Sequence, residues 1–191
     1  MLRADAVRQV VEALPDDHLL VACNGMIGRE VFTARDREST FYMIGSMGLA
    51  LSIGLGVAQC RPDRQVVVLD GDGNVLMGAG VLATAAALAP ENLHHVVLDN
   101  EAHGSTGDQR TVSDVVPLEA MAKAAGYVSA ERVDAEDLAK VMPAFLAKKG
   151  PALLLAKVDK GNQHGIARVT HTPPEITARF SRAIAKESGS S

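Results

Sequence analysis

Two polar residues in this sequence, Asp72 and Asn100, have the chemistry of ligands for a hard cation. Asp72 follows the apolar run that begins at Val66, and Asn100 follows the one that begins at His95. Short apolar runs of this kind are typical of strands buried on both faces of a parallel sheet. Since α/β folds bind ligands at the carboxyl edge of that sheet, we expect the two side chains to converge there. A carboxylate and an amide oxygen in one place suit Mg²⁺ or Ca²⁺.

The elements that must position these two groups form a βαβ unit. The Ala- and Leu-rich segment from Gly78 to Ala89 lies between the two runs and is expected to be the crossover helix. Gly71 and Gly73 flank Asp72, and because glycine has no side chain, the backbone there can approach a ligand phosphate closely. The unit therefore predicts a site for a metal-bound anion at two neighbouring strand ends.

This unit resembles the thiamine-diphosphate-binding motif, in which Gly-Asp-Gly is followed by a spacer of this size and a closing Asn. The resemblance implies that Asp72, the side chain of Asn100 and the backbone carbonyl of Ala102 bind a Mg²⁺ ion, which holds the diphosphate of the cofactor. Further contacts with the cofactor are expected at Gly71, Gly73, Asn74 and Ser105. The family usually has two consecutive Asn at the end of the motif, and Asp99 replaces the first of them here.

A second glycine-rich segment, Gly45-Ser-Met-Gly48, precedes an expected helix over 49–59. Its glycines allow the backbone to pass close to a ligand or to another helix. Ser46 offers a hydroxyl near a helix N-terminus, where anions bind readily. Beside a Gly-Asp-Gly unit, the segment resembles the second cofactor element of the thiamine enzymes. That implies a hydrogen bond from the aminopyrimidine to the carbonyl of Gly45, and a role for Met47 as the apolar wedge that bends the cofactor. Taken alone, Met47 would be an ordinary core residue.

The polar segment from Glu101 to Thr111 directly follows the expected metal ligands, so it should border the site. His103 could donate to a substrate anion or exchange a proton, although an exposed loop histidine explains it equally well. Arg110 could pair with an acidic substrate tail. His164 lies in a loop after the last expected strand, where it could face the site or a partner.

Composition bounds the class of protein. A chain of 191 residues, 47% of them hydrophobic, can bury a substantial core as one domain over 1–191. The net charge of −4, without a long basic run, argues against nucleic acid as a partner. Cys23 and Cys60 are too few for a disulfide framework, so a cytoplasmic location is expected. Residues 41–58 form the most apolar segment, but glycines interrupt it, so no membrane span is predicted.

Alternating patterns elsewhere complete an α/β fold: a single doubly wound, mostly parallel sheet with helices on both faces. Arg61 and Arg64, in the turn before the first apolar run, are expected to be solvated, and Cys60 to be buried. Further helices are expected at 4–14, 27–34, 117–125, 135–148 and from about 173, and further strands at 18–23, 127–133 and 152–158.

From Phe41 to Thr111 the chain is most similar to thiamine-dependent decarboxylases of 3-sulfopyruvate and 3-phosphonopyruvate. That family also needs a domain that binds the aminopyrimidine and carries a catalytic Glu, and 191 residues leave no room for it. The resemblance therefore implies a hetero-oligomer with an α subunit that supplies this domain. Sulfopyruvate, which gives sulfoacetaldehyde and CO₂, is the preferred substrate. Phosphonopyruvate, which gives phosphonoacetaldehyde, is the alternative.

Two other classes of protein deserve comparison. A receiver-type signalling domain would explain Val66 to Asp70 as a strand that ends in a phosphoacceptor, but the first expected strand ends in Cys23-Asn24 and lacks the acidic pair that such domains need. A non-catalytic nucleotide-binding or regulatory module of the same fold is the second. Metal-dependent binding of thiamine diphosphate would distinguish both from the enzyme.

Overall fold

A six-stranded sheet runs through the computed structural model, which describes residues 1–186. The strand order is β2-β1-β3-β4-β8-β7, and every neighbouring pair is parallel. The strands are β1 (Leu19–Ala22), β2 (Thr40–Tyr42), β3 (Val66–Gly71), β4 (Leu93–Asp99), β7 (Ser129–Asp134) and β8 (Ala152–Lys157). A small antiparallel pair, β5 (Ala102–His103) and β6 (Gln109–Arg110), lies outside this sheet.

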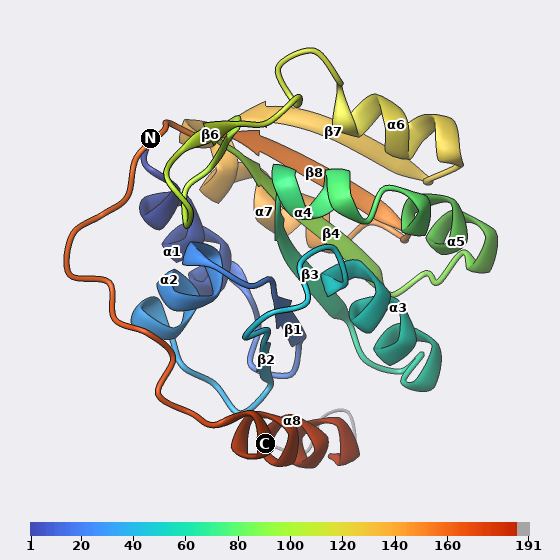
Figure 1. Ribbon diagram of the computed structural model, residues 1–191. Coiled ribbons are helices and arrows are strands. Elements are labelled where there is room, and N and C mark those ends of the chain that lie inside the picture. Colours follow the sequence, from blue (N-terminus) through green and yellow to red (C-terminus); the bar gives the residue numbers. More distant parts are fainter. Residues whose placement is uncertain (187–191) are drawn as a thin grey trace.

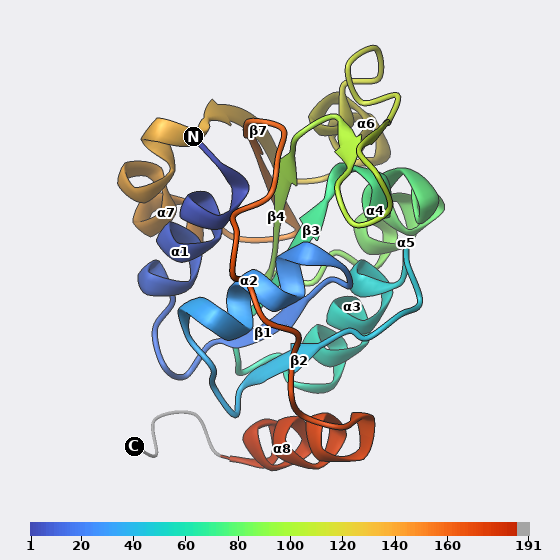
Figure 2. The ribbon, with the colours of Figure 1, turned by 60° about the vertical axis from the view of Figure 1, so that its left-hand side comes forward.

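Helices cover both faces of the sheet (Figures 1 and 2). One face carries α1 (Arg3–Ala13), α2 (Met26–Ala34) and α7 (Leu138–Leu146), which follows a short 3-10 turn at Ala135–Asp137. The other carries α3 (Ala50–Cys60), α4 (Asp72–Met77), α5 (Gly80–Leu88) and α6 (Leu118–Ala125). Helix α8 (Pro173–Ala185) packs beside the edge strand β2. The predicted doubly wound α/β fold is confirmed.

The two central strands, β3 and β4, are buried along their whole length. Each pairs with a parallel neighbour on both sides and is covered by helices on both faces, which is why its sequence is a continuous apolar run rather than an alternating one. Within β4, His94 and His95 are fully buried. These strands form a rigid base for the polar residues that follow them.

The crossover between β3 and β4 consists of two helices, whereas the sequence predicted one helix over 78–89. Helix α4 begins at Asp72, directly after β3, and Gly78 separates it from α5. A Cβ atom at Gly78 would lie only 2.2 Å from the backbone oxygen of Gly48. Two backbone segments therefore meet at this point, and the contact requires a glycine there.

Two expectations for the turn before β3 are wrong. Arg64 is buried, with 5% of its surface exposed, because its guanidinium donates to the backbone carbonyls of Asp17 and Ala183. Cys60, expected to be buried, is exposed at the end of α3. Among residues 1–186, no helix is both long and apolar enough to cross a membrane.

Candidate cofactor site

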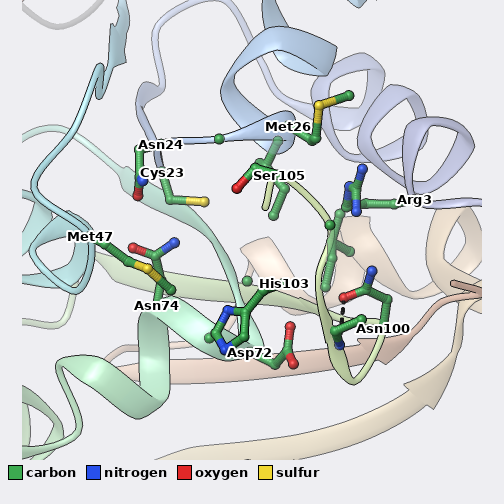
Figure 3. Close-up of a pocket in the computed structure, with 17 residues that line it drawn as sticks. Arg3, Cys23, Asn24, Met26, Met47, Asp72, Asn74, Asn100, His103 and Ser105 are labelled. Atoms are coloured by element: carbon green, nitrogen blue, oxygen red, sulfur yellow. Dashed lines mark hydrogen bonds between the residues drawn. The ribbon is translucent and has the colours of Figure 1, made fainter. Parts of the chain in front are cut away.

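A pocket opens at the carboxyl ends of β1 and β3 (Figure 3). The chain leaves β1 toward β2 on one side and returns to β3 on the other, so the strand order reverses between β1 and β3. Such switch points are where open α/β sheets bind their ligands. The lining comes from 23–27 after β1, from 71–74 at the end of β3, and from Asn100 and 102–105 after β4, together with Arg3, Met47 and Leu98.

Asp72 lies in this pocket with 3% of its surface exposed. Hydroxyl groups of Thr111 and Ser113 contact its Oδ2 atom, the latter at 3.2 Å. Burial raises the pKa of Asp72, and the neighbouring charge of Asp99 raises it further, while the hydrogen bond from Thr111 lowers it. No basic side chain in the described part of the chain pairs with Asp72. A buried carboxylate without a counter-ion fits a cation binding here.

Asn100 and Ala102 lie in the same pocket as Asp72. The Oδ1 atom of Asn100 accepts a hydrogen bond from the backbone nitrogen of Ala102 at 3.3 Å, while its Nδ2 atom is buried without a partner. The two ends of an amide can be exchanged, and the exchanged form would turn the oxygen into the unpartnered position. In residues 1–186 no three His, Cys, Asp or Glu side chains form a metal cluster. A metal held by Asp72, the Asn100 amide and a backbone carbonyl would be a hard ion such as Mg²⁺.

Asp99 is fully buried behind this set. Its carboxylate accepts hydrogen bonds from Lys157 Nζ at 2.9 Å and from Ser113 Oγ at 2.8 Å. Lys157 also bonds to Glu101. The carboxylate that replaces the family's usual Asn is thus paired with Lys157, and Ser113 lies between it and Asp72.

The two glycine-rich segments are joined through Asn74, whose Oδ1 accepts a hydrogen bond from the backbone nitrogen of Gly48 at 2.8 Å. A Cβ atom on Gly73 would lie 3.0 Å from Met47 Cε and 2.7 Å from His103 Cε1, so these two side chains close over Gly73. Met47 and His103 therefore belong to the pocket wall.

Gly45 and Ser46 are not brought into this pocket. They line a separate groove between β2 and α8, together with Ile53 and Ile176. A Cβ atom on Gly45 would meet no atom within 4 Å, so nothing in the described part of the chain requires glycine there.

Only some of the residues predicted to border the site after β4 line the pocket. His103 and Ser105 line the pocket. Arg110 is paired with Asp114 on the surface and His164 is exposed, and neither lines the pocket. Thr111 ends the segment that was expected to border the site, and it contacts Asp72. Residues at the site that the sequence did not indicate are Arg3, Ser113 and Lys157. Only Lys157 left a signal, as the single charged residue of the otherwise apolar strand β8.

The fold and this pocket define the class of thiamine-diphosphate-binding domains. The family described as "Thiamine pyrophosphate enzyme, C-terminal TPP binding domain" matches residues 21–156, and thiamine pyrophosphate is another name for thiamine diphosphate. The chain belongs to this family.

Several curated proteins are similar to it. A phosphonopyruvate decarboxylase of Streptomyces viridochromogenes is 45% identical over 93% of this chain and 45% of its own length. The sulfopyruvate decarboxylase subunit beta of Methanothermobacter thermautotrophicus is 40% identical over 95% of both chains. The chain thus spans about half the length of the first relative. The solved benzoylformate decarboxylase of Polynucleobacter necessarius, at 21% identity and a TM-score of 0.66, covers 85% of this chain and 34% of its own, and it shares the fold.

Proposed function

We propose that this chain is the diphosphate- and Mg²⁺-binding subunit of a thiamine-diphosphate-dependent decarboxylase that converts 3-sulfopyruvate to sulfoacetaldehyde and CO₂. The observation that carries the proposal is the convergence of Asp72, Asn100 and Ala102 in one pocket, where the Asp72 carboxylate is buried without a counter-ion. Relatives named as sulfopyruvate decarboxylase subunit beta, at 36–40% identity, support the assignment of the reaction.

The residues that the sequence predicted for the site have proposed tasks. Asp72, Asn100 and the carbonyl of Ala102 would hold Mg²⁺, and the backbone at Gly71 and Gly73 would admit the diphosphate. Thiamine diphosphate, when bound, supplies the nucleophile for the 2-oxo carbon and the electron sink for decarboxylation. Further cofactor contacts are proposed for Gly45, Ser46, Asn74 and Ser105.

Two side chains lie close enough to influence the reacting end. Met47, half-buried at the edge of the pocket, would support the bent form of the cofactor. His103, packed beside it, would hold or pass a proton at the substrate.

An α subunit would supply the pyrimidine-binding domain and the catalytic Glu. The surface next to Met47 is unusually apolar: Ile44, Leu49 and Met77 expose 58%, 48% and 66% of their areas. A shallow depression lined by Met47, Leu49 and Met77 lies there. A partner covering this surface would seal the reacting end from water. Since both cysteines are free, we place the complex in the cytoplasm.

The test is reconstitution. The chain is purified alone and with the α subunit, and CO₂ release from sulfopyruvate is measured with thiamine diphosphate and Mg²⁺. We expect turnover only in the complex, and none with Asp72→Ala, while the surface control Asp5→Ala retains it. Robust turnover by the chain alone would overturn the proposal that the α subunit completes the active site. Absence of Mg²⁺-dependent cofactor binding would favour a non-catalytic module.

Phosphonopyruvate is the second candidate substrate, because the phosphonopyruvate decarboxylase of Streptomyces viridochromogenes is 45% identical to this chain. Both substrates carry an acidic group on the carbon next to the 2-oxo group, so they compete for one pocket. Comparing kcat/KM for the two acids on the same complex decides between them. We expect sulfopyruvate to have the higher value.

A further inference from the structure

Arg3 lies in the wall of the pocket and has no part in the proposed metal site. Only 4% of its surface is exposed. Its Nε and Nη2 atoms donate to the two carboxylate oxygens of Glu30 at 2.9 Å each, and Nη2 also donates to Asn162 Oδ1 at 2.6 Å. Asn162 in turn donates to the backbone oxygen of Gly104 at 3.0 Å, which ties the loop after β4 to the same group. The guanidinium is therefore held in one orientation.

The remaining amino group of Arg3, Nη1, makes no hydrogen bond to any residue of the described range 1–186. It lies 3.1 Å from the position of a Cβ atom on Gly104, at the lining of the pocket. Glu30 balances the charge of the buried guanidinium, so the ion pair is tolerated in the interior. What is left is a fixed, charged donor that lacks an acceptor, which is the kind of group that binds phosphate-like oxygens most strongly.

The position of Arg3 in the pocket indicates which ligand group would accept a hydrogen bond from Nη1. Figure 3 shows Arg3 near Asn100 and Ser105, whereas Met47 and Asn74 lie at the opposite end. Under the proposed function, Met47 marks the reacting end of the cofactor, so Arg3 lies at the end that receives the diphosphate.

We propose that Arg3 binds the terminal phosphate of thiamine diphosphate through Nη1. This inference rests on the proposed function. A phosphonate or sulfonate of the substrate has the same chemistry, so the experiment must separate the two sources.

Thiamine monophosphate, which lacks the terminal phosphate, provides that separation. Calorimetry on the reconstituted complex with Mg²⁺ compares the affinity for thiamine diphosphate with the affinity for the monophosphate. The principal variant is the double replacement Arg3→Gln with Glu30→Gln, which avoids leaving Glu30 as a buried unpaired charge. Arg8→Gln is the matched control, because Arg8 lies on the same helix with its side chain exposed and paired to Asp5.

We expect the double variant to bind thiamine diphosphate roughly 10- to 100-fold more weakly, as the loss of a hydrogen bond to a charged group predicts, and to bind the monophosphate as the parent does. Arg3→Lys keeps the positive charge but loses the planar fork, so it should show a smaller loss of the same selectivity. If the double variant does not fold by its urea midpoint, Arg3→Lys decides the question.

Equal weakening of both ligands would overturn the inference, since it would mean that Arg3 only supports the fold. An unchanged affinity for thiamine diphosphate with a raised KM for the acidic substrate would also overturn it, in favour of a substrate anchor. If the parent complex does not bind the cofactor, the proposed function fails as well. If the parent binds it and the Arg3 variants are indistinguishable from it, only this inference fails.

Discussion

Asp72 lowers the stability of the metal-free protein, and it is also the main ligand of the proposed metal site. Because burial raises its pKa, the folded chain binds the proton of this carboxyl more tightly than the unfolded chain does. The contribution of Asp72 to the free energy of unfolding therefore falls as pH rises from the ordinary pKa of an aspartate to the higher pKa in the folded chain. We expect Asp72→Asn to raise the Tm of the metal-free protein at pH 7.

The same substitution should remove the Mg²⁺-dependent binding of thiamine diphosphate. Thermal unfolding with and without Mg²⁺ and cofactor measures both effects on one sample. A lower Tm for the metal-free Asp72→Asn protein would show that the hydrogen bond from Thr111 outweighs the burial of the charge.

Met47 tests the proposed wedge. Met47→Ala should lower turnover more than it lowers cofactor affinity, because the diphosphate end of the pocket is unchanged. Truncation of a fully buried Met costs about 2–5 kcal/mol, and Met47 is only half-buried, so the loss of stability should be smaller. Met121→Ala, another partly buried Met on α6, controls for that loss. Unchanged turnover in folded Met47→Ala would return Met47 to the ordinary core.

Single residues were predictable where a local rule applied. Asp72 and Asn100 follow buried strands, and neighbouring parallel strands bring such residues to one edge. The role of Ala102 was expected only from the family resemblance. Arg3 and Ser113 belong to no such pattern, because their partners lie far away in the sequence, as Glu30 does from Arg3. Contacts of this kind depend on the packing of whole helices.

Among the helices and strands too, features that follow a local sequence pattern could be predicted, and features that depend on distant contacts could not. The runs of β3 and β4 could be recognised because a strand buried on both faces has a continuous apolar sequence. The break between α4 and α5 could not, since it follows from the approach of the backbone at Gly48 to Gly78. Nor could the burial of Arg64, whose acceptors include the carbonyl of Ala183 on the last helix.

The contact between Gly48 and Gly78 gives a prediction for the segment 45–48, which carries Met47. Gly78→Ala places a methyl group against the backbone oxygen of Gly48, so either α4 or the 45–48 segment must move. We expect a loss of about 1–3 kcal/mol in the free energy of unfolding, together with weaker cofactor binding. Gly80→Ala is the matched control, because a Cβ atom there meets nothing within 4 Å. Urea unfolding of the pair checks it, and equal stabilities would contradict the proposed contact.

At the scale of the whole molecule, two buried histidines contribute to the response to acid. Burial lowers the pKa of His94 and of His18, so the folded chain binds their protons less tightly than the unfolded chain does. Stability should therefore fall as pH drops below about 6.5, the ordinary value for histidine. His94→Gln keeps a donor for the carbonyl of Lys148 and cannot titrate.

The measurement is the urea midpoint at pH 8, 6 and 5 for the parent and for His94→Gln. The variant should lose less stability than the parent across this range, and the comparison removes the opposite contribution of Asp72. Identical losses would show that His94 binds protons equally well in the folded and the unfolded state, which would contradict the lowered pKa.

The hydrogen bond between Arg3 and Asn162 joins residues separated by 159 positions. During synthesis, the early part of a chain emerges first, so β1, β3 and β4 are available long before Asn162. Closing so wide a loop is entropically costly, and folds with distant pairings form slowly. A nascent chain would thus assemble its metal ligands and the Arg3–Glu30 pair first, and would gain the Asn162 contacts to Arg3 and Gly104 only near completion. Cofactor affinity would then rise in the last stage of folding, and a chain that ends before Asn162 should hold the diphosphate more weakly than the full chain.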